Sequence, residues 1–103
     1  MELITPQELS EQLKAGCRLL DVREKWETEV ASLPGSVHIP MGDVTRRYQE
    51  LDPDQEWIVY CHHGIRSANV IAFLKTVGFE KLKNLRGGID AWSRHVDSTV
   101  PRY

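Results

Sequence analysis

One stretch of the chain, from Cys61 to Ser67, gathers a thiol, two imidazoles, a guanidinium and a hydroxyl within seven residues. It follows an apolar run, Trp57 to Tyr60, and precedes a segment with helical periodicity, so the cysteine is expected where a strand becomes a helix. The first N–H groups of a helix have no intrahelical acceptor, and the positive end of the helix dipole lies beside them. Because these features favour an anion, a thiol at this position is expected to ionise readily and to act as a nucleophile.

The residues that follow the thiol are suited to holding an anionic sulfur atom. Inward-facing N–H groups would form a cradle, and Gly64 permits backbone conformations that a side chain would resist. Arg66 adds a permanent positive charge and is expected either to face the substrate or to pair with an acidic residue such as Asp21. The two histidines would tune access of an anionic donor. We therefore predict Cys61 as the catalytic residue and, as substrate-binding residues, His62, His63, Gly64, Ile65, Arg66 and Ser67.

Other interpretations of the cysteines compete with this one. Free cysteines often fill apolar cores, but the polar and glycine neighbours of Cys61 favour catalysis, and we expect its thiol in a surface loop outside the core. Cys17 follows Gly16 without any comparable pattern, so packing is favoured there. A thiol followed by two imidazoles could also ligate zinc, yet adjacent residues rarely converge on one ion and no second ligand pair at metal spacing exists. No metal site is predicted.

The elements that must position this loop alternate between helices and strands. Helical segments are predicted over about 6–15, 24–30, 43–51, 67–77 and 89–95, and strands over about 18–22, 37–39, 57–60 and 82–85. This alternation predicts an α/β domain with a mainly parallel central sheet of about four to five strands flanked by helices. In such sheets ligands bind at the carboxyl ends of the strands, where Cys61 and the charged cluster Asp21 to Glu24 fall.

Length and charge restrict the classes of function. A chain of 103 residues predicts one domain spanning residues 1–103. The net charge of -2, with both signs interspersed, offers no basic face for nucleic acid and no polybasic stretch for a membrane. No apolar run approaches the roughly 18 residues that span a bilayer, and no signal peptide is recognised, so a cytoplasmic location is expected. The two cysteines form no C-x-x-C pair, which favours free thiols in a reducing compartment.

Three motifs, in this order, resemble the rhodanese family of single-domain sulfurtransferases. Leu19 to Glu24 is similar to the first-strand signature of that family, and Leu33 to Pro40 is similar to its glycine-rich turn and Ile-Pro exit. The third motif is the Cys61 to Ser67 loop with Gly87 to Trp92 behind it. Ser32 departs from the pattern, because many relatives have a histidine there. The resemblance covers nearly the whole chain and implies the three-layer rhodanese-like fold.

The resemblance also implies a persulfide cycle, with no metal and no organic cofactor. In that cycle the Cys61 thiolate takes the outer sulfur of a small anionic donor such as thiosulfate and passes it to cyanide, an acceptor thiol or a partner protein. One alternative is a persulfide carrier or protein-binding module without useful thiosulfate turnover. A less favoured alternative is a cysteine phosphatase or arsenate reductase. Phosphatases of similar fold place five residues between thiol and arginine, whereas His62 to Ile65 supply four, which predicts a narrower cradle suited to sulfur.

Overall fold

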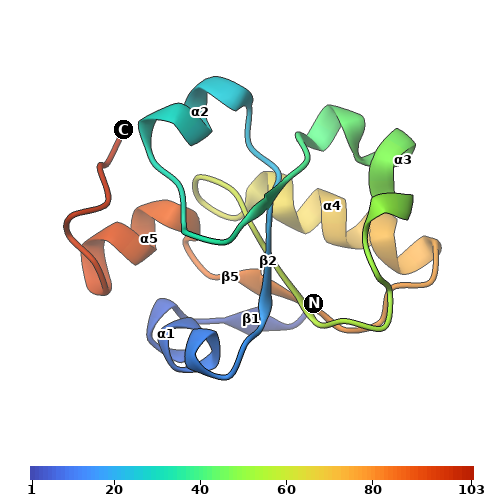
Figure 1. The fold of residues 1–103 in the computed structure, drawn as a ribbon, viewed down its shortest axis with the longest axis horizontal. Helices are drawn as coiled ribbons and strands as arrows, with labels where there is room; N and C mark the ends of the chain where they lie inside the picture. Colours follow the sequence, from blue (N-terminus) through green and yellow to red (C-terminus); the bar gives the residue numbers. More distant parts are fainter.

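The computed structural model describes residues 1–103 and contains one five-stranded sheet. The strands lie in the order β1 (Leu3–Ile4), β5 (Leu82–Leu85), β4 (Trp57–Tyr60), β2 (Arg18–Asp21) and β3 (Val37–His38), and every neighbouring pair is parallel. The predicted α/β fold with a parallel central sheet is confirmed (Figure 1). The strand that the sequence did not reveal is β1, because two residues are too short to show a period.

Helices cover both faces of this sheet. The elements α1 (Pro6–Lys14) and α5 (Gly88–His95) pack on one face, and the other face carries α4 (Ile65–Thr76) and α3 (Val44–Arg47), which lies between two 3₁₀ turns. The short helix α2 (Lys25–Val30) follows β2 and lies beyond the carboxyl end of that strand (Figure 1). This three-layer arrangement brings α2, α4 and α5 together around the end of the sheet where Cys61 lies.

The central strand β4 divides the core into two apolar clusters. Trp57 and Val59 face the cluster under α4, whereas Ile58 and Tyr60 face the cluster under α1 and α5, and all four are buried. This alternation is the normal period of a strand, and burial on both faces is typical of a central parallel strand. Cys61 continues the alternation and joins the same cluster as Val59. The strand therefore aims the thiol toward the α4 side of the sheet.

Helix α4 begins two residues earlier than the sequence predicted. Gly64 precedes it with a backbone φ of 111°, a conformation that side chains resist, and Ile65 is the first helical residue. The reversal at Gly64 lets the chain turn tightly from β4 into the helix. Arg66 and Ser67 consequently lie in the first turn of α4 rather than in the loop before it.

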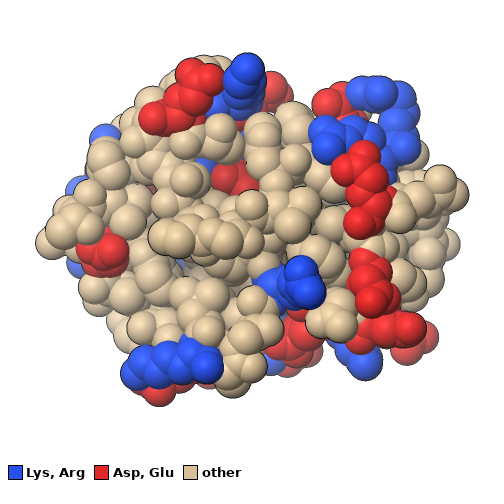
Figure 2. Space-filling view, in the orientation of Figure 1, with Lys and Arg blue, Asp and Glu red and all other residues tan.

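The surface carries both signs of charge in close proximity. On the face shown in Figure 2, lysine and arginine side chains lie beside aspartate and glutamate side chains. One such exposed pair joins Arg47 Nε to Glu50 Oε2 at 2.8 Å. None of the helices combines the length and the apolar character needed to cross a bilayer.

Candidate active site

The sulfur of Cys61 lies just past the carboxyl end of β4 and is bound by two backbone groups. The N–H of Gly64 donates to Sγ at 3.1 Å and the N–H of Ser67 donates at 3.4 Å. The hydroxyl oxygen of Ser67 lies 3.3 Å from the same sulfur. The prediction placed the N–H groups of residues 62 to 67 around the sulfur. Two of these groups, at Gly64 and Ser67, donate to Sγ, and the other four do not.

Cys61 is buried, which corrects the expectation of a thiol in a surface loop. Only 1% of the residue is exposed, and it belongs to the same apolar cluster as Leu20 and Ile39. The reason is the strand period, which carries through Cys61 and directs its side chain inward. Two N–H groups and a hydroxyl nevertheless meet the sulfur, so its surroundings are polar on the side that faces α4.

The carbonyl groups of the loop are bound elsewhere. The first N–H groups of α5 take two of them: Ile89 N donates to Cys61 O at 2.9 Å, and Asp90 N donates to His62 O at 3.2 Å. Gly88 makes this approach possible, because a Cβ atom at that position would lie 2.2 Å from His62 O. The double glycine thus allows α5 to contact the loop closely. Because these carbonyls accept hydrogen bonds from α5, they are held away from the sulfur.

Arg66 is paired inside the protein. Its guanidinium donates to both carboxylate oxygens of Glu27 in α2, at 2.6 and 2.8 Å, so its partner is not Asp21. The hydroxyl of Tyr103 also donates to Glu27, at 2.6 Å. Hydrogen bonding from Arg66, more than any other cause, lowers the pKa of Glu27 to about 2. The pair is therefore ionised at neutral pH and ties the first turn of α4 to α2.

Asp21 instead forms a buried pair with Arg23, which is fully buried. The Arg23 guanidinium donates to the two Asp21 oxygens at 3.0 and 2.7 Å, and a third nitrogen donates to the hydroxyl of Tyr103 at 2.9 Å. Tyr60 completes the network by donating to Asp21 at 3.0 Å, and burial is the main reason that its pKa rises to about 12. Asp21 and Arg23, at the end of β2, are thus joined in an internal network that links this strand to β4 and to the C-terminal Tyr103.

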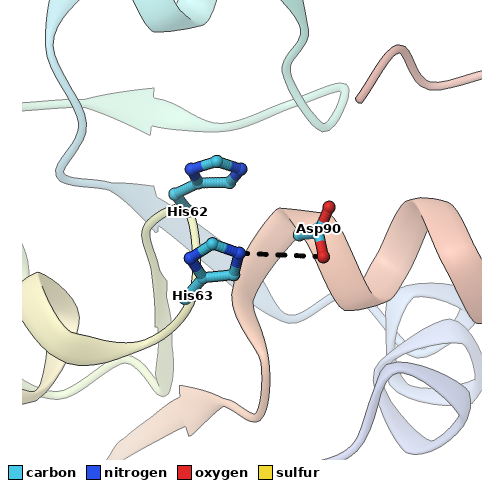
Figure 3. A group of neighbouring side chains, drawn as sticks. All are labelled: His62, His63 and Asp90. Atoms are coloured by element: carbon cyan, nitrogen blue, oxygen red, sulfur yellow. Dashed lines mark ion pairs between the residues drawn. The ribbon is translucent and has the colours of Figure 1, made fainter. Parts of the chain in front are cut away.

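Both histidines of the loop lie beside Asp90 of α5 (Figure 3). His63 Nε2 is 3.7 Å from Asp90 Oδ2, and one ligand atom from each of the three residues lies within 4.8 Å of the others. The His62 ring stacks between His63 and Tyr103, with centroids 4.1 Å apart on either side. Burial is the first cause that lowers the pKa of His62, followed by the charge of His63.

This group does not have the arrangement of a metal centre. The two imidazole planes are inclined by only 17° and lie one above the other, so their nitrogens do not converge in plane on a common point. Asp90 is also engaged by Arg102, whose Nε donates to it at 2.9 Å. The rings of His63, His62 and Tyr103 instead form a stack beside the loop, and Asp90 is the ion-pair partner of His63.

Four residues around the site were absent from the predicted set: Glu27, Asn84, Asp90 and Tyr103. Asn84 of β5 is 4% exposed, and its side chain binds both Gly64 and Ser67. A polar amide within a short strand that has a leucine at each end is a signal that sequence reasoning could have used. Tyr103 had no such signal, because it reaches the site only through the path of the segment after α5.

The similarity of this chain to known proteins extends over most of its length. The model of the family described as Rhodanese-like domain matches residues 5–95. The candidate sulfurtransferase YtwF of Bacillus subtilis is 43% identical over 74 residues, covering 72% of this chain and 71% of YtwF. The candidate sulfur carrier protein YrkF of the same organism is 43% identical over 75 residues, covering 73% of this chain and 40% of YrkF.

A third relative is the thiosulfate sulfurtransferase GlpE of Haemophilus influenzae, which is 33% identical over 91 residues, with 88% of this chain and 87% of GlpE covered. Among solved structures, a rhodanese-related protein from Thermoplasma volcanium superimposes with a TM-score of 0.87 and 32% identity. That match covers 93% of this chain and 94% of the archaeal one.

Proposed function

This chain belongs to the family of rhodanese-like domains, and from that premise we propose that it is a sulfurtransferase whose catalytic residue is Cys61. The observation that supports this assignment is the contact of Gly64 and Ser67 N–H groups with the sulfur at the start of α4. N–H groups and the positive end of a helix both stabilise sulfur when it is negatively charged. The relatives named as sulfurtransferases support the same class of reaction.

The proposed reaction has two displacement steps at sulfur. In the first, the Cys61 thiolate attacks the outer sulfur of thiosulfate, the S–S bond of the donor breaks, and sulfite leaves with the bonding electron pair. In the second, cyanide or an acceptor thiolate attacks the outer sulfur of the persulfide, and the Cys61 thiolate leaves. Thiosulfate is proposed as donor because GlpE, which carries that name, is a relative along most of this chain.

The loop would hold the persulfide without a free cation. Gly64 and Ser67 would keep the inner sulfur, and the N–H groups of Ile65 and Arg66, which have no acceptor in the protein, would receive the outer one. The guanidinium of Arg66 is paired with Glu27, so we assign it to fixing the loop. His62 and His63 would line the mouth through which donor and acceptor approach.

A persulfide carrier is the second candidate. None of the five surface cavities is lined by a residue from 61 to 67, so no deep pocket for a small substrate lies beside Cys61. A site without such a pocket is suited to contact with a partner protein that delivers or receives sulfur. The relative YrkF, named as a sulfur carrier, supports this alternative.

Intact-mass measurement tests the assignment. After incubation with thiosulfate, or with a cysteine desulfurase and cysteine, the wild-type chain should gain the mass of one sulfur atom, and Cys61→Ser should gain none. Cys17→Ser is the matched control and should load normally, because Cys17 lies at the opposite end of the sheet near Glu56. If the loaded chain forms thiocyanate repeatedly from thiosulfate and cyanide, the result supports the sulfurtransferase. If it loads sulfur but does not turn over, the result supports the persulfide carrier.

The same experiment can refute the proposal. If Cys61→Ser loads sulfur as wild type does, Cys61 is not the acceptor. Steady hydrolysis of an aryl phosphate without any sulfur loading would instead favour phosphatase chemistry. Free thiols are typical of a reducing compartment, and we propose the cytoplasm.

A further inference from the structure

One side chain binds both residues whose N–H groups hold the sulfur. The amide nitrogen of Asn84 donates to the carbonyl oxygen of Gly64 at 3.0 Å, and the amide oxygen of Asn84 accepts from the hydroxyl of Ser67 at 2.6 Å. Gly64 and Ser67 are the two residues that donate backbone N–H groups to Cys61 Sγ. Asn84 thus lies behind the loop, on the neighbouring strand β5, and contacts it at both donor residues.

The orientation of this amide is fixed by its partners. The nitrogen faces two acceptors, Gly64 O and, at 3.4 Å, Met1 Sδ, whereas the oxygen faces the hydroxyl of Ser67. A rotated amide would place its nitrogen against Ser67 and its oxygen against Gly64 O, and the bond to that carbonyl would be lost. Both Asn84 and Ser67 are buried, so water cannot replace the hydrogen bond between them, whereas the bond to Gly64 O is partly buried.

The position of Asn84 is itself rigid. Its backbone pairs with Leu3 on one side and Val59 on the other, and its N–H donates to Glu2 O at 3.0 Å. Gly64, by contrast, has a positive φ and no side chain, and besides the Asn84 amide its carbonyl accepts only the N–H of Ala68, at the longer distance of 3.3 Å. A fixed side chain on a central part of the sheet therefore supplies the shorter of the two restraints on this carbonyl.

We propose that Asn84 is a positioning residue for the sulfur of Cys61: by binding Gly64 and Ser67 together, it keeps their N–H groups directed at Sγ. The proposal rests on the proposed function only in taking Cys61 as the reacting residue. A preorganised donor stabilises charge without reorganising during the reaction, so a looser cradle should hold anionic sulfur less well. Asn84 does not touch the sulfur and is not a catalytic residue.

Amide hydrogen exchange measured by NMR tests the restraint directly. In Asn84→Leu, which removes both polar contacts, exchange at Gly64 and Ser67 is expected to accelerate roughly tenfold, the effect of losing one hydrogen bond. Exchange within the later turns of α4, for example at Leu74, should not change. The matched control is Trp57→Phe, which removes a partly buried hydrogen bond to Asp52 O at the other end of β4 and should leave Gly64 and Ser67 protected.

A second readout follows the charge on the sulfur. Ultraviolet thiolate absorbance is titrated in chains that carry Cys17→Ser and Ser67→Ala, so that one thiol remains and no freed hydroxyl can compensate. In this background Asn84 acts on the sulfur through Gly64 alone. Adding Asn84→Leu should move the titration midpoint upward by roughly half a pH unit, a threefold loss of thiolate. Both readouts are independent of sulfur transfer, so they stand even if the chain transfers no sulfur.

The proposal is overturned if both amides keep wild-type exchange rates in folded Asn84→Leu and the titration midpoint does not move. If that variant fails to fold, Asn84→Asp replaces it. Above the pKa of the new carboxyl group, the ionised carboxylate keeps the shape and the acceptor for Ser67 but cannot donate to Gly64 O, so at such a pH only the Gly64 amide should lose protection. Unchanged protection of Gly64 in Asn84→Asp would overturn the proposal equally.

Discussion

The guanidinium of Arg66 and the carboxylate of Glu27 are joined by two hydrogen bonds, 2.6 and 2.8 Å long, across the gap between α4 and α2. The only arginine of the cysteine loop is therefore neutralised within the protein. The pair contributes to the shape of the site, because it holds the first turn of α4 against α2, which follows a different strand. Tyr103 adds a third hydrogen bond to the same carboxylate.

Glu27→Gln should lower the free energy of unfolding by about 2 kcal/mol, because it leaves Arg66 and Tyr103 facing a neutral amide in a buried position. Urea unfolding measures the change. Glu50→Gln is the matched control, since Glu50 makes a similar two-bond pair with Arg47 on the exposed surface and should change stability little. Equal effects of the two substitutions would contradict the buried role of Glu27.

The same pair predicts a loss of stability in acid. The pKa of Glu27 is lowered to about 2, so the ionised carboxylate stabilises the folded state fully above its ordinary value of 4.5. As the pH falls from 4.5 toward 2, that contribution is lost. Stability should fall by about 2 kcal/mol, which is less than the shift in pKa alone would give, because partial exposure of Arg66 screens the pair. Urea unfolding across this range should show a shallower slope for Glu27→Gln. If wild type and Glu27→Gln lose stability equally over this pH range, the pair of Arg66 and Glu27 is not the cause of the loss.

Tyr103 is expected to act through two separable contacts. Tyr103→Phe removes the hydroxyl shared by Glu27 and Arg23 and should cost about 1 to 2 kcal/mol, while its ring still stacks on His62. Tyr103→Ala also uncovers His62, whose pKa is lowered mainly by burial, and should raise that pKa toward its ordinary value of 6.5. NMR titration of His62 distinguishes the variants; a shift of equal size in both would show that the stack is irrelevant.

Gly88→Ala tests the close contact between α5 and the loop. Its Cβ would lie 2.2 Å from His62 O and 2.5 Å from Cys61 O, so the backbone must move and stability should fall by about 3 kcal/mol or more. Gly16→Ala is the control, because Gly16 also has a positive φ but no atom within 4 Å of the added Cβ. That change should cost about 1 kcal/mol. If Gly88→Ala and Gly16→Ala lower the unfolding temperature equally, the positive φ explains the cost and the contact with the loop does not.

The sequence was sufficient to predict the fold because its elements follow local rules. The strands at 57–60 and 82–85 were predicted at their observed bounds, and the capping box of Thr5 and Glu8 is present with both hydrogen bonds. Bounds failed where backbone geometry decides them, as at Gly64, whose positive φ moves the start of α4 to Ile65. Such a conformation has no counterpart in hydrophobic periodicity.

The environment of the site was less predictable because it is assembled from distant segments. The loop from Cys61 to Ser67 was found from its own residue types, but its partner Glu27 comes from α2 and Tyr103 comes from beyond α5. The choice of Glu27 over Asp21 depends on how α2 packs beside α4, and no spacing along the chain reports that distance. The burial of Cys61 was missed for a simpler reason: the strand alternation was not extended past Tyr60.

The contact of α5 with the loop has a consequence for how such a chain can evolve. The carbonyls of Cys61 and His62 are bound by α5, while the N–H groups of Gly64 and Ser67 are bound to the sulfur, so a single inserted residue would put one of these sets out of register. A longer loop that accommodates a bulkier oxyanion would require a simultaneous change at Gly88. Loop and double glycine are therefore coupled, and a residue inserted into the loop alone would break contacts either with α5 or with the sulfur.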